Sequence, residues 1–203
     1  MKELKLLKEE LTKSLPFHQA RISFLSLFLL ALVDAQTTNL KKIAQKFKGR
    51  AQIDSHYKRI QRFLRGFELD FSLFARFLCN WMPFENKWTL CLDRTNWKLG
   101  QQNINILVLG VAYKGICIPL FCSSLSKRGN SNTEERLELL QRFLTTFGKD
   151  RIACLTADRE FIGREWIQGL LESGIPFRIR VKKNTQARSA RSHQQMDLYK
   201  LFR

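Results

Sequence analysis

The sequence has no apolar run long enough to cross a membrane. Its longest run, FLSLFLLALV at residues 24–33, has ten residues, whereas a transmembrane helix needs about 20. The run also begins too far into the chain, after a segment of mixed charge, to be a signal peptide. We therefore expect a buried helix here and no membrane partner.

The sequence also lacks the cysteine patterns of zinc sites and disulfide frameworks. Its five cysteines are an odd number, form no Cys-x-x-Cys pair and have no histidine pair nearby. Most lie in apolar runs, where a free cysteine behaves as a small hydrophobe. This usage argues against structural zinc and a disulfide framework, and it favours a protein of the reducing cytoplasm. A glycine-rich phosphate turn is missing too, which argues against a doubly wound nucleotide fold.

Acidic residues are few, and the chain carries a formal net charge of +17. The excess lies at the two ends: residues 1–85 and 178–203 carry +7 each, against +3 for residues 86–177. A polyanion is the natural partner for such a chain, and nucleic acid is the commonest polyanion. The alternative is a soluble protein that is merely basic.

Residues 1–85 have the apolar spacing of helices and are expected to form a DNA-binding region. Two short helices, in 38–47 and 53–65, joined by a turn containing Gly49, resemble a helix-turn-helix. Residues 41–65 carry nine basic side chains and one acid. The alternative is a helical bundle whose solvated face happens to be basic. The candidate DNA contacts are Lys41, Lys42, Gln52, His56, Arg59, Arg62 and Arg65.

From residue 87 the pattern changes to short, nearly continuous apolar runs, which suit buried strands. Three such runs come first, and single runs then alternate with amphipathic helices up to residue 184. The predicted order, β-β-β-α-β-α-β, is that of a ribonuclease-H-like mixed sheet. The expected fold class is therefore α/β, with an all-helical N-terminal region (1–85), a catalytic core (86–184) and a basic polar tail (185–203).

Two of these runs, WTLCLD and RIACLTAD, end in an aspartate, Asp93 and Asp158. In this topology the first and fourth strands are neighbours, so their C-terminal ends would bring the two carboxylates together. Paired carboxylates repel each other unless they share a cation, and Mg²⁺ (or Mn²⁺) suits such a site. The alternative is that each aspartate merely ends a strand, since aspartate is common at turns.

Three motifs in this order resemble the DDE transposases of bacterial insertion sequences, and most closely the insertion-sequence-four family. They are LDRTNW (92–97), KRGNS (127–131) and ADREF (157–161). The resemblance implies that Asp93 and Asp158 are catalytic metal ligands for cleavage and strand transfer in DNA transposition. It also implies double-stranded transposon ends as partner, a homodimer or pairing with a full-length transposase, and a nucleoid-associated bacterial protein.

The third acid of that family, a glutamate in a downstream Y-R-E-K type motif, does not occur in these 203 residues. We therefore expect an incomplete catalytic core. Glu160 is a weak candidate substitute, and surface contact or helix capping suits it better. The alternative functions are a non-catalytic DNA-binding inhibitor of transposition and a nonfunctional transposase remnant.

The resemblance places the loop at residues 127–131 near the rim of the site. Lys127, Arg128 and Asn130 are therefore candidate phosphate contacts, and Arg159 could hold a phosphate or neutralise the two acids. The alternative is an ordinary solvated loop. Trp97 and Trp166 fit core positions better than base-stacking positions.

Overall fold

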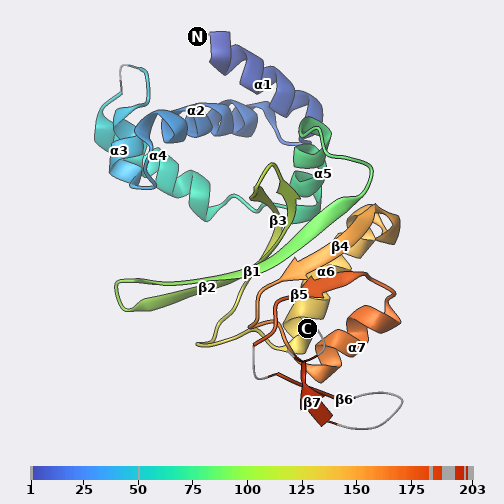
Figure 1. Cartoon of the computed structure of the whole chain (residues 1–203). Coiled ribbons are helices and arrows are strands. Elements are labelled where there is room, and N and C mark those ends of the chain that lie inside the picture. Colours follow the sequence, from blue (N-terminus) through green and yellow to red (C-terminus); the bar gives the residue numbers. More distant parts are fainter. Residues whose placement is uncertain (1, 50, 183–184, 189–194, 199, 201–203) are drawn as a thin grey trace. The chain divides into compact units, whose positions relative to one another are not determined.

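In a computed structural model the chain forms two compact units, Met1–Phe77 and Leu78–Arg203 (Figure 1). The structure describes residues 2–49, 51–182, 185–188, 195–198 and 200. Arg50 and part of the expected basic tail lie outside these described residues.

The first unit is helical, as expected. Pro16 lies in the break between the first two helices, and the side chain of Asn39 accepts hydrogen bonds from the backbone of Lys41 and Lys42 to begin the third. No helix within the described ranges combines the length and apolar character that a bilayer crossing requires. The helices are α1 Lys2–Ser14, α2 Gln19–Ala35, α3 Leu40–Gln45, α4 Ile53–Arg65 and α5 Phe71–Trp81, which extends across the division between the units.

The core of the helical unit forms where α2, α3 and α4 meet. Its buried residues are Phe24, Ala31, Ile43, Ala44, Phe47 and Ile60. Two apolar residues of α4, Ile53 and Leu64, are 47% and 45% exposed. The inward face of α4 is therefore narrower than its apolar spacing suggested.

The second unit is built on a five-stranded sheet of order β3-β2-β1-β4-β5. β1 pairs antiparallel with β2 and parallel with β4. This order, with α6 and α7 as the connections, confirms the predicted ribonuclease-H-like mixed sheet. The elements are β1 Trp88–Leu99, β2 Gln102–Tyr113, β3 Ile116–Ser124, α6 Thr133–Phe147, η1 Lys149–Arg151, β4 Ile152–Ala157, α7 Arg164–Glu172 and β5 Phe177–Ile179. A two-stranded sheet, β6 Gln186–Arg188 and β7 Gln195–Asp197, follows.

One face of the five-stranded sheet carries the core. Leu90, Leu107 and Leu155 are fully buried on this face, where α6 packs through Phe143 against Phe121. Alternate residues of β1 point to the opposite face, where Cys91 is half-buried and Asp93 exposed. The apolar runs suggested buried strands, but only one face of β1 is buried.

β1 is also longer than expected. The apolar run predicted a strand that ends at Asp93, but β1 continues to Leu99 because its second half pairs with β2. Asp93 therefore lies inside a strand, at the point where β1 stops pairing with β4 but continues to pair with β2.

Candidate active site

The two aspartates follow paired residues of neighbouring parallel strands. Leu92 pairs with Ala157, and this is the last pair between β1 and β4. The backbone N–H of Arg180 donates to the carbonyl of Ala157 at 3.0 Å, so the parallel pattern reaches the end of β4. Asp93 is the next residue of β1, and Asp158 directly follows the last residue of β4.

Both carboxylates have cationic or donor partners. The backbone N–H of Arg94 donates to Asp93 at 2.7 Å. The Arg180 guanidinium lies 3.6 Å from Asp158, which is 53% exposed. No group of three or more histidine, cysteine, aspartate or glutamate side chains that could hold a metal occurs among the described residues.

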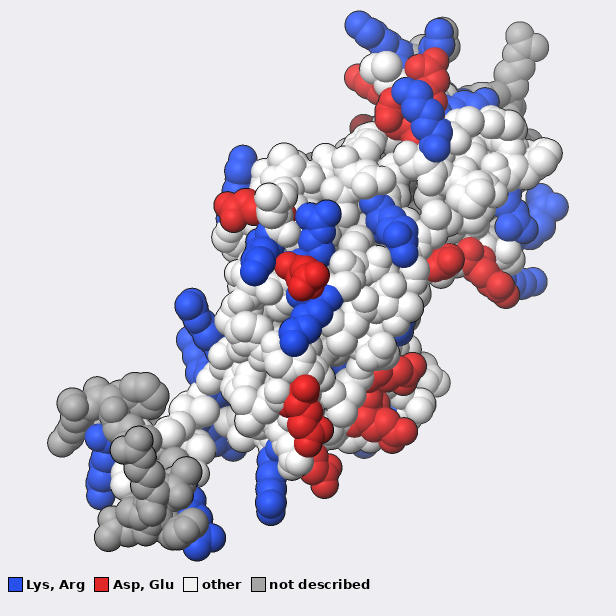
Figure 2. Space-filling view, turned by 90° about the vertical axis from the view of Figure 1, so that its right-hand side faces the viewer, with Lys and Arg blue, Asp and Glu red and all other residues white. Residues whose placement is uncertain are grey.

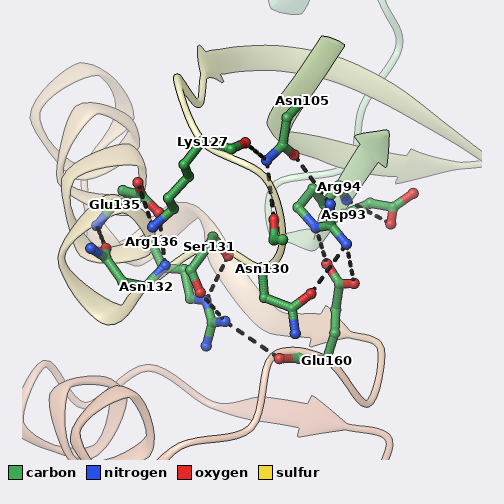
Figure 3. A network of polar contacts seen from close by, with 11 residues as sticks. Asp93, Arg94, Asn105, Lys127, Asn130, Ser131, Asn132, Glu135, Arg136 and Glu160 are labelled. Atoms are coloured by element: carbon green, nitrogen blue, oxygen red, sulfur yellow. Dashed lines mark hydrogen bonds and ion pairs between the residues drawn. The ribbon is translucent and has the colours of Figure 1, made fainter. Parts of the chain in front are cut away.

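Beside Asp93, the Arg94 side chain binds Glu160 through two parallel hydrogen bonds. Nε donates to Oε1 at 2.8 Å and Nη2 to Oε2 at 3.0 Å. The Arg94 side chain is only 11% exposed, and its hydrogen bond to Glu160 raises the pKa of Arg94. In Figure 3 the Asp93 carboxylate points away from this pair. The Glu160 carboxylate is therefore bound to Arg94 and does not join the two aspartates as a third metal ligand.

Arg94 also connects β2 to the loop at residues 127–131. Its Nη1 donates to the side-chain oxygen of Asn105 at 3.2 Å, and its Nη2 to that of Asn130 at 3.2 Å. The Asn105 amide in turn donates to the carbonyls of Lys127 and Gly129 at 2.9 and 3.1 Å (Figure 3). Sequence reasoning missed Asn105, although a polar residue inside the apolar run 104–109 was a usable signal.

The far end of this loop is held by α6. Arg136 donates from Nε to the Ser131 hydroxyl at 2.9 Å and from Nη2 to the Glu160 carbonyl at 3.4 Å. Partial burial lowers the pKa of Arg136. Asn132 and Glu135 form a reciprocal capping box at the start of α6. The loop is therefore fixed at both ends.

Two of the candidate phosphate contacts of this region are bound to other side chains of the protein, and the other two are exposed to solvent. Lys127 makes a 2.9 Å ion pair with Glu135, and Asn130 accepts from Arg94. Arg128 and Arg159 are exposed. An open cleft of about 670 Å³ is lined by Asn130, Arg159, Glu160, Ile162, Lys182 and Thr185.

Glu135 provides a pH-dependent test of the loop's anchor. Partial burial raises its pKa, but hydrogen bonds from Lys127 and from the Asn132 backbone outweigh burial, so the pKa lies below its usual value. Its contribution is therefore present above the ordinary glutamate pKa and is lost as pH falls through the lowered one. Glu135→Gln, which keeps the capping box, should cost about 0.5–1 kcal/mol at neutral pH and almost nothing near pH 3. Urea unfolding at both pH values checks this, and an equal loss at both would contradict it.

Two thiols lie close together on the face that carries Asp93. Cys91 of β1 pairs with Gly110, and a Cβ added at Gly110 would lie 2.5 Å from Sγ of Cys117. The hydrogen bond with the Cys117 thiol lowers the pKa of Cys91 to about 6, and the same hydrogen bond raises the pKa of Cys117. The missing side chain at Gly110 thus lets thiols from β1 and β3 meet across β2.

The candidate DNA contacts of the helical unit fall into two groups. Lys41, Lys42, Gln52, Arg62 and Arg65 are exposed. On the face drawn in Figure 2, basic side chains are scattered rather than gathered into one continuous patch.

The other two candidates are engaged within the helical unit. His56 is only 8% exposed and lies against Phe47, with ring centroids 5.2 Å apart. Arg59 is exposed, but its guanidinium lies 4.7 Å from the centroid of the Phe24 ring. Burial removes His56 from the surface that DNA could reach.

Comparisons with known proteins add little to this geometry. No family model and no curated protein matches the chain. The HTLV-2 integrase catalytic core domain, in complex with magnesium, is 13% identical with a TM-score of 0.35, over 47% of this chain and 62% of that one. A simian T-cell lymphotropic virus intasome, in complex with PP2A regulatory subunit B56 gamma, is 12% identical with a TM-score of 0.37, over 65% of this chain and 45% of that one.

The chain therefore spans less than two thirds of either matched chain. The ribonuclease-H-like fold assignment follows from the sheet order and the connections between its strands.

Proposed function

We propose that the chain is a transposase-type protein of the insertion-sequence-four kind that binds DNA, with Asp93 and Asp158 as the metal-binding acids of a phosphodiester-cleaving site. The observation that supports this proposal is the last β1–β4 pair, Leu92 with Ala157, which both aspartates directly follow although they are 65 residues apart. The net charge of +17 supports a polyanionic partner.

The two aspartates fit a hard divalent cation. Mg²⁺ is usually held by one or two carboxylates together with waters and substrate phosphate oxygens, and the exposure of both residues leaves room for these. A bound Mg²⁺ or Mn²⁺ would supply Lewis-acid activation of the phosphodiester. Asp93 and Asp158 would hold it, and the exposed Arg159 would bind the phosphate chain beside them.

A mutational test separates this site from the rest of the chain. Nicking of plasmid DNA that needs Mg²⁺ should be lost in Asp93→Asn and in Asp158→Asn, each by about 100-fold or more. Asp150→Asn is the matched control, because Asp150 is exposed in η1, which precedes β4, whereas Asp158 follows it. Nicking that survives both substitutions would refute the site.

A non-catalytic DNA-binding role is the second candidate function, and the binding of Glu160 to Arg94 favours it. With that carboxylate bound to Arg94, two acids remain at the edge, and no third ligand gathers with them among the described residues. This role predicts that DNA binding weakens steeply with salt and persists in Asp93→Asn and Asp158→Asn, while even the wild type does not nick. Nicking by the wild type would exclude it.

A further inference from the structure

β1 and β2 continue beyond the five-stranded sheet as a two-stranded arm. Pairing of β1 with β4 ends at Leu92, and pairing of β2 with β3 ends at Ile106. The β1–β2 ladder itself continues to the pair Leu99 and Gln102. The hairpin of residues 95–104, with Asn105 as its anchor at the base, projects past the neighbouring strands, as Figure 1 shows; residues 95–105 are called the arm below.

The arm presents an exposed tryptophan. Trp97 is 47% exposed and pairs with Ile104 on the opposite strand. Trp166, by contrast, is fully buried in α7. An aromatic ring that is half exposed on a projecting hairpin is placed to stack on a partner. The core position expected for Trp97 from the sequence is thus not the one it occupies.

The ring faces the same side of the sheet as the candidate metal ligand. Side chains alternate along a strand, so Asp93, Thr95 and Trp97 share one face of β1. Four residues of strand span roughly 13 Å, which is about four base steps of duplex DNA. A nucleic-acid strand held at Asp93 therefore reaches Trp97 when it runs along the arm.

The chemistry of the arm fits nucleic acid. Residues 95–105 contain no aspartate or glutamate and one lysine, Lys98. The arm itself exposes Lys98, which attracts phosphate, and the amides of Asn96, Gln101 and Gln102, which both donate and accept hydrogen bonds. A protein partner needs an apolar surface larger than one indole, and the polar residues around Trp97 do not supply it.

We propose that the arm is a nucleic-acid contact in which Trp97 stacks on an unpaired base of the strand held at Asp93 and Asp158. This inference rests on the proposed function, since it takes DNA as the substrate. Stacking of an aromatic ring tolerates any base, so the site would recognise a single-stranded end rather than a sequence. Affinity for DNA with such an end should exceed affinity for a blunt duplex.

Fluorescence anisotropy with two labelled DNAs tests the proposal on the intact chain. One is a short blunt duplex, and the other is the same duplex with a single-stranded 3′ overhang of about four nucleotides. Wild type should bind the overhang DNA about ten-fold more tightly. Trp97→Ala should remove this preference, and Trp97→Phe, which keeps an aromatic ring, should retain most of it.

The control is Trp81→Ala, because Trp81 is similarly exposed at 54% but belongs to α5. Its overhang preference should equal that of the wild type. If Trp97→Ala keeps the preference, stacking is refuted while DNA binding stands. An equal loss on both DNAs in Trp97→Ala would also refute stacking, since the ring would then contact the duplex. If the wild type binds neither DNA, this inference and the proposed function both fall, and a protein becomes the partner to seek.

Discussion

Arg94→Ala should be among the most damaging single substitutions in the sheet unit, with a loss of about 3–5 kcal/mol in the free energy of unfolding. The side chain is 11% exposed and makes two hydrogen bonds to Glu160. Its removal leaves that carboxylate and the buried oxygen of Asn105 without their donor. Most of this loss comes from leaving these acceptors without a hydrogen-bond donor, and less comes from the lost attraction between Arg94 and Glu160.

Three further variants, compared with Arg94→Ala by urea denaturation, test this prediction. Arg94→Lys keeps the charge but cannot form both hydrogen bonds to Glu160. Its loss in the free energy of unfolding should therefore be smaller than that of Arg94→Ala but larger than that of Arg128→Ala. Glu160→Gln should cost less than Arg94→Ala, because Glu160 is more exposed at 26%. Arg128→Ala removes an exposed arginine and should change stability by less than about 0.5 kcal/mol. An Arg94→Ala loss as small as that of Arg128→Ala would contradict the prediction.

Gly110→Ala should destabilise the sheet by about 1–3 kcal/mol through overpacking. In an ordinary strand this change is favourable, since alanine restricts the unfolded chain more than glycine does. Here the added Cβ would meet the backbone carbonyl of Ile118 and lie 2.5 Å from Sγ of Cys117. Backbone cannot swing aside as a flexible side chain does, so β2 and β3 must separate locally.

Ala112→Val is the matched control for that effect. Ala112 is exposed two residues further along β2, on the same face, and valine suits strands. Its thermal midpoint should stay close to that of the wild type, whereas that of Gly110→Ala should fall by several degrees. A Gly110→Ala protein as stable as wild type would mean that the bulge between Leu109 and Gly110 absorbs the new methyl group.

Much of the sheet could be predicted because apolar runs and amphipathic helices mark its elements and their order. The arm was missed because its sequence is polar, and a search for continuous apolar runs ends at Asp93. Thr95, Trp97 and Leu99 alternate with Asn96 and Lys98, and that period of two was the available signal. In the helical unit, His56 was predicted to be a DNA contact, although it precedes the apolar Ile60 by four residues, a spacing that indicates the inward face of α4.

The adjacency of β1 and β4 followed from topology, but the surroundings of the aspartates did not. Glu160 and Lys127 were considered as acids and cations that a ligand could use, yet each is paired within the protein. Contacts between polar side chains that are far apart in sequence produce no periodic pattern from which they could be predicted. Only the folded backbone brings Arg94 to Glu160.

The 66-residue separation of Arg94 and Glu160 also sets an order of assembly. The ladders β1–β2 and β2–β3 join neighbouring segments and close small loops, whereas β1–β4 must close a loop several times longer. Local pairings form faster than distant ones. We therefore expect the β1–β4 pairing, and with it the contact between Arg94 and Glu160, to form after the β1–β2 and β2–β3 ladders during refolding.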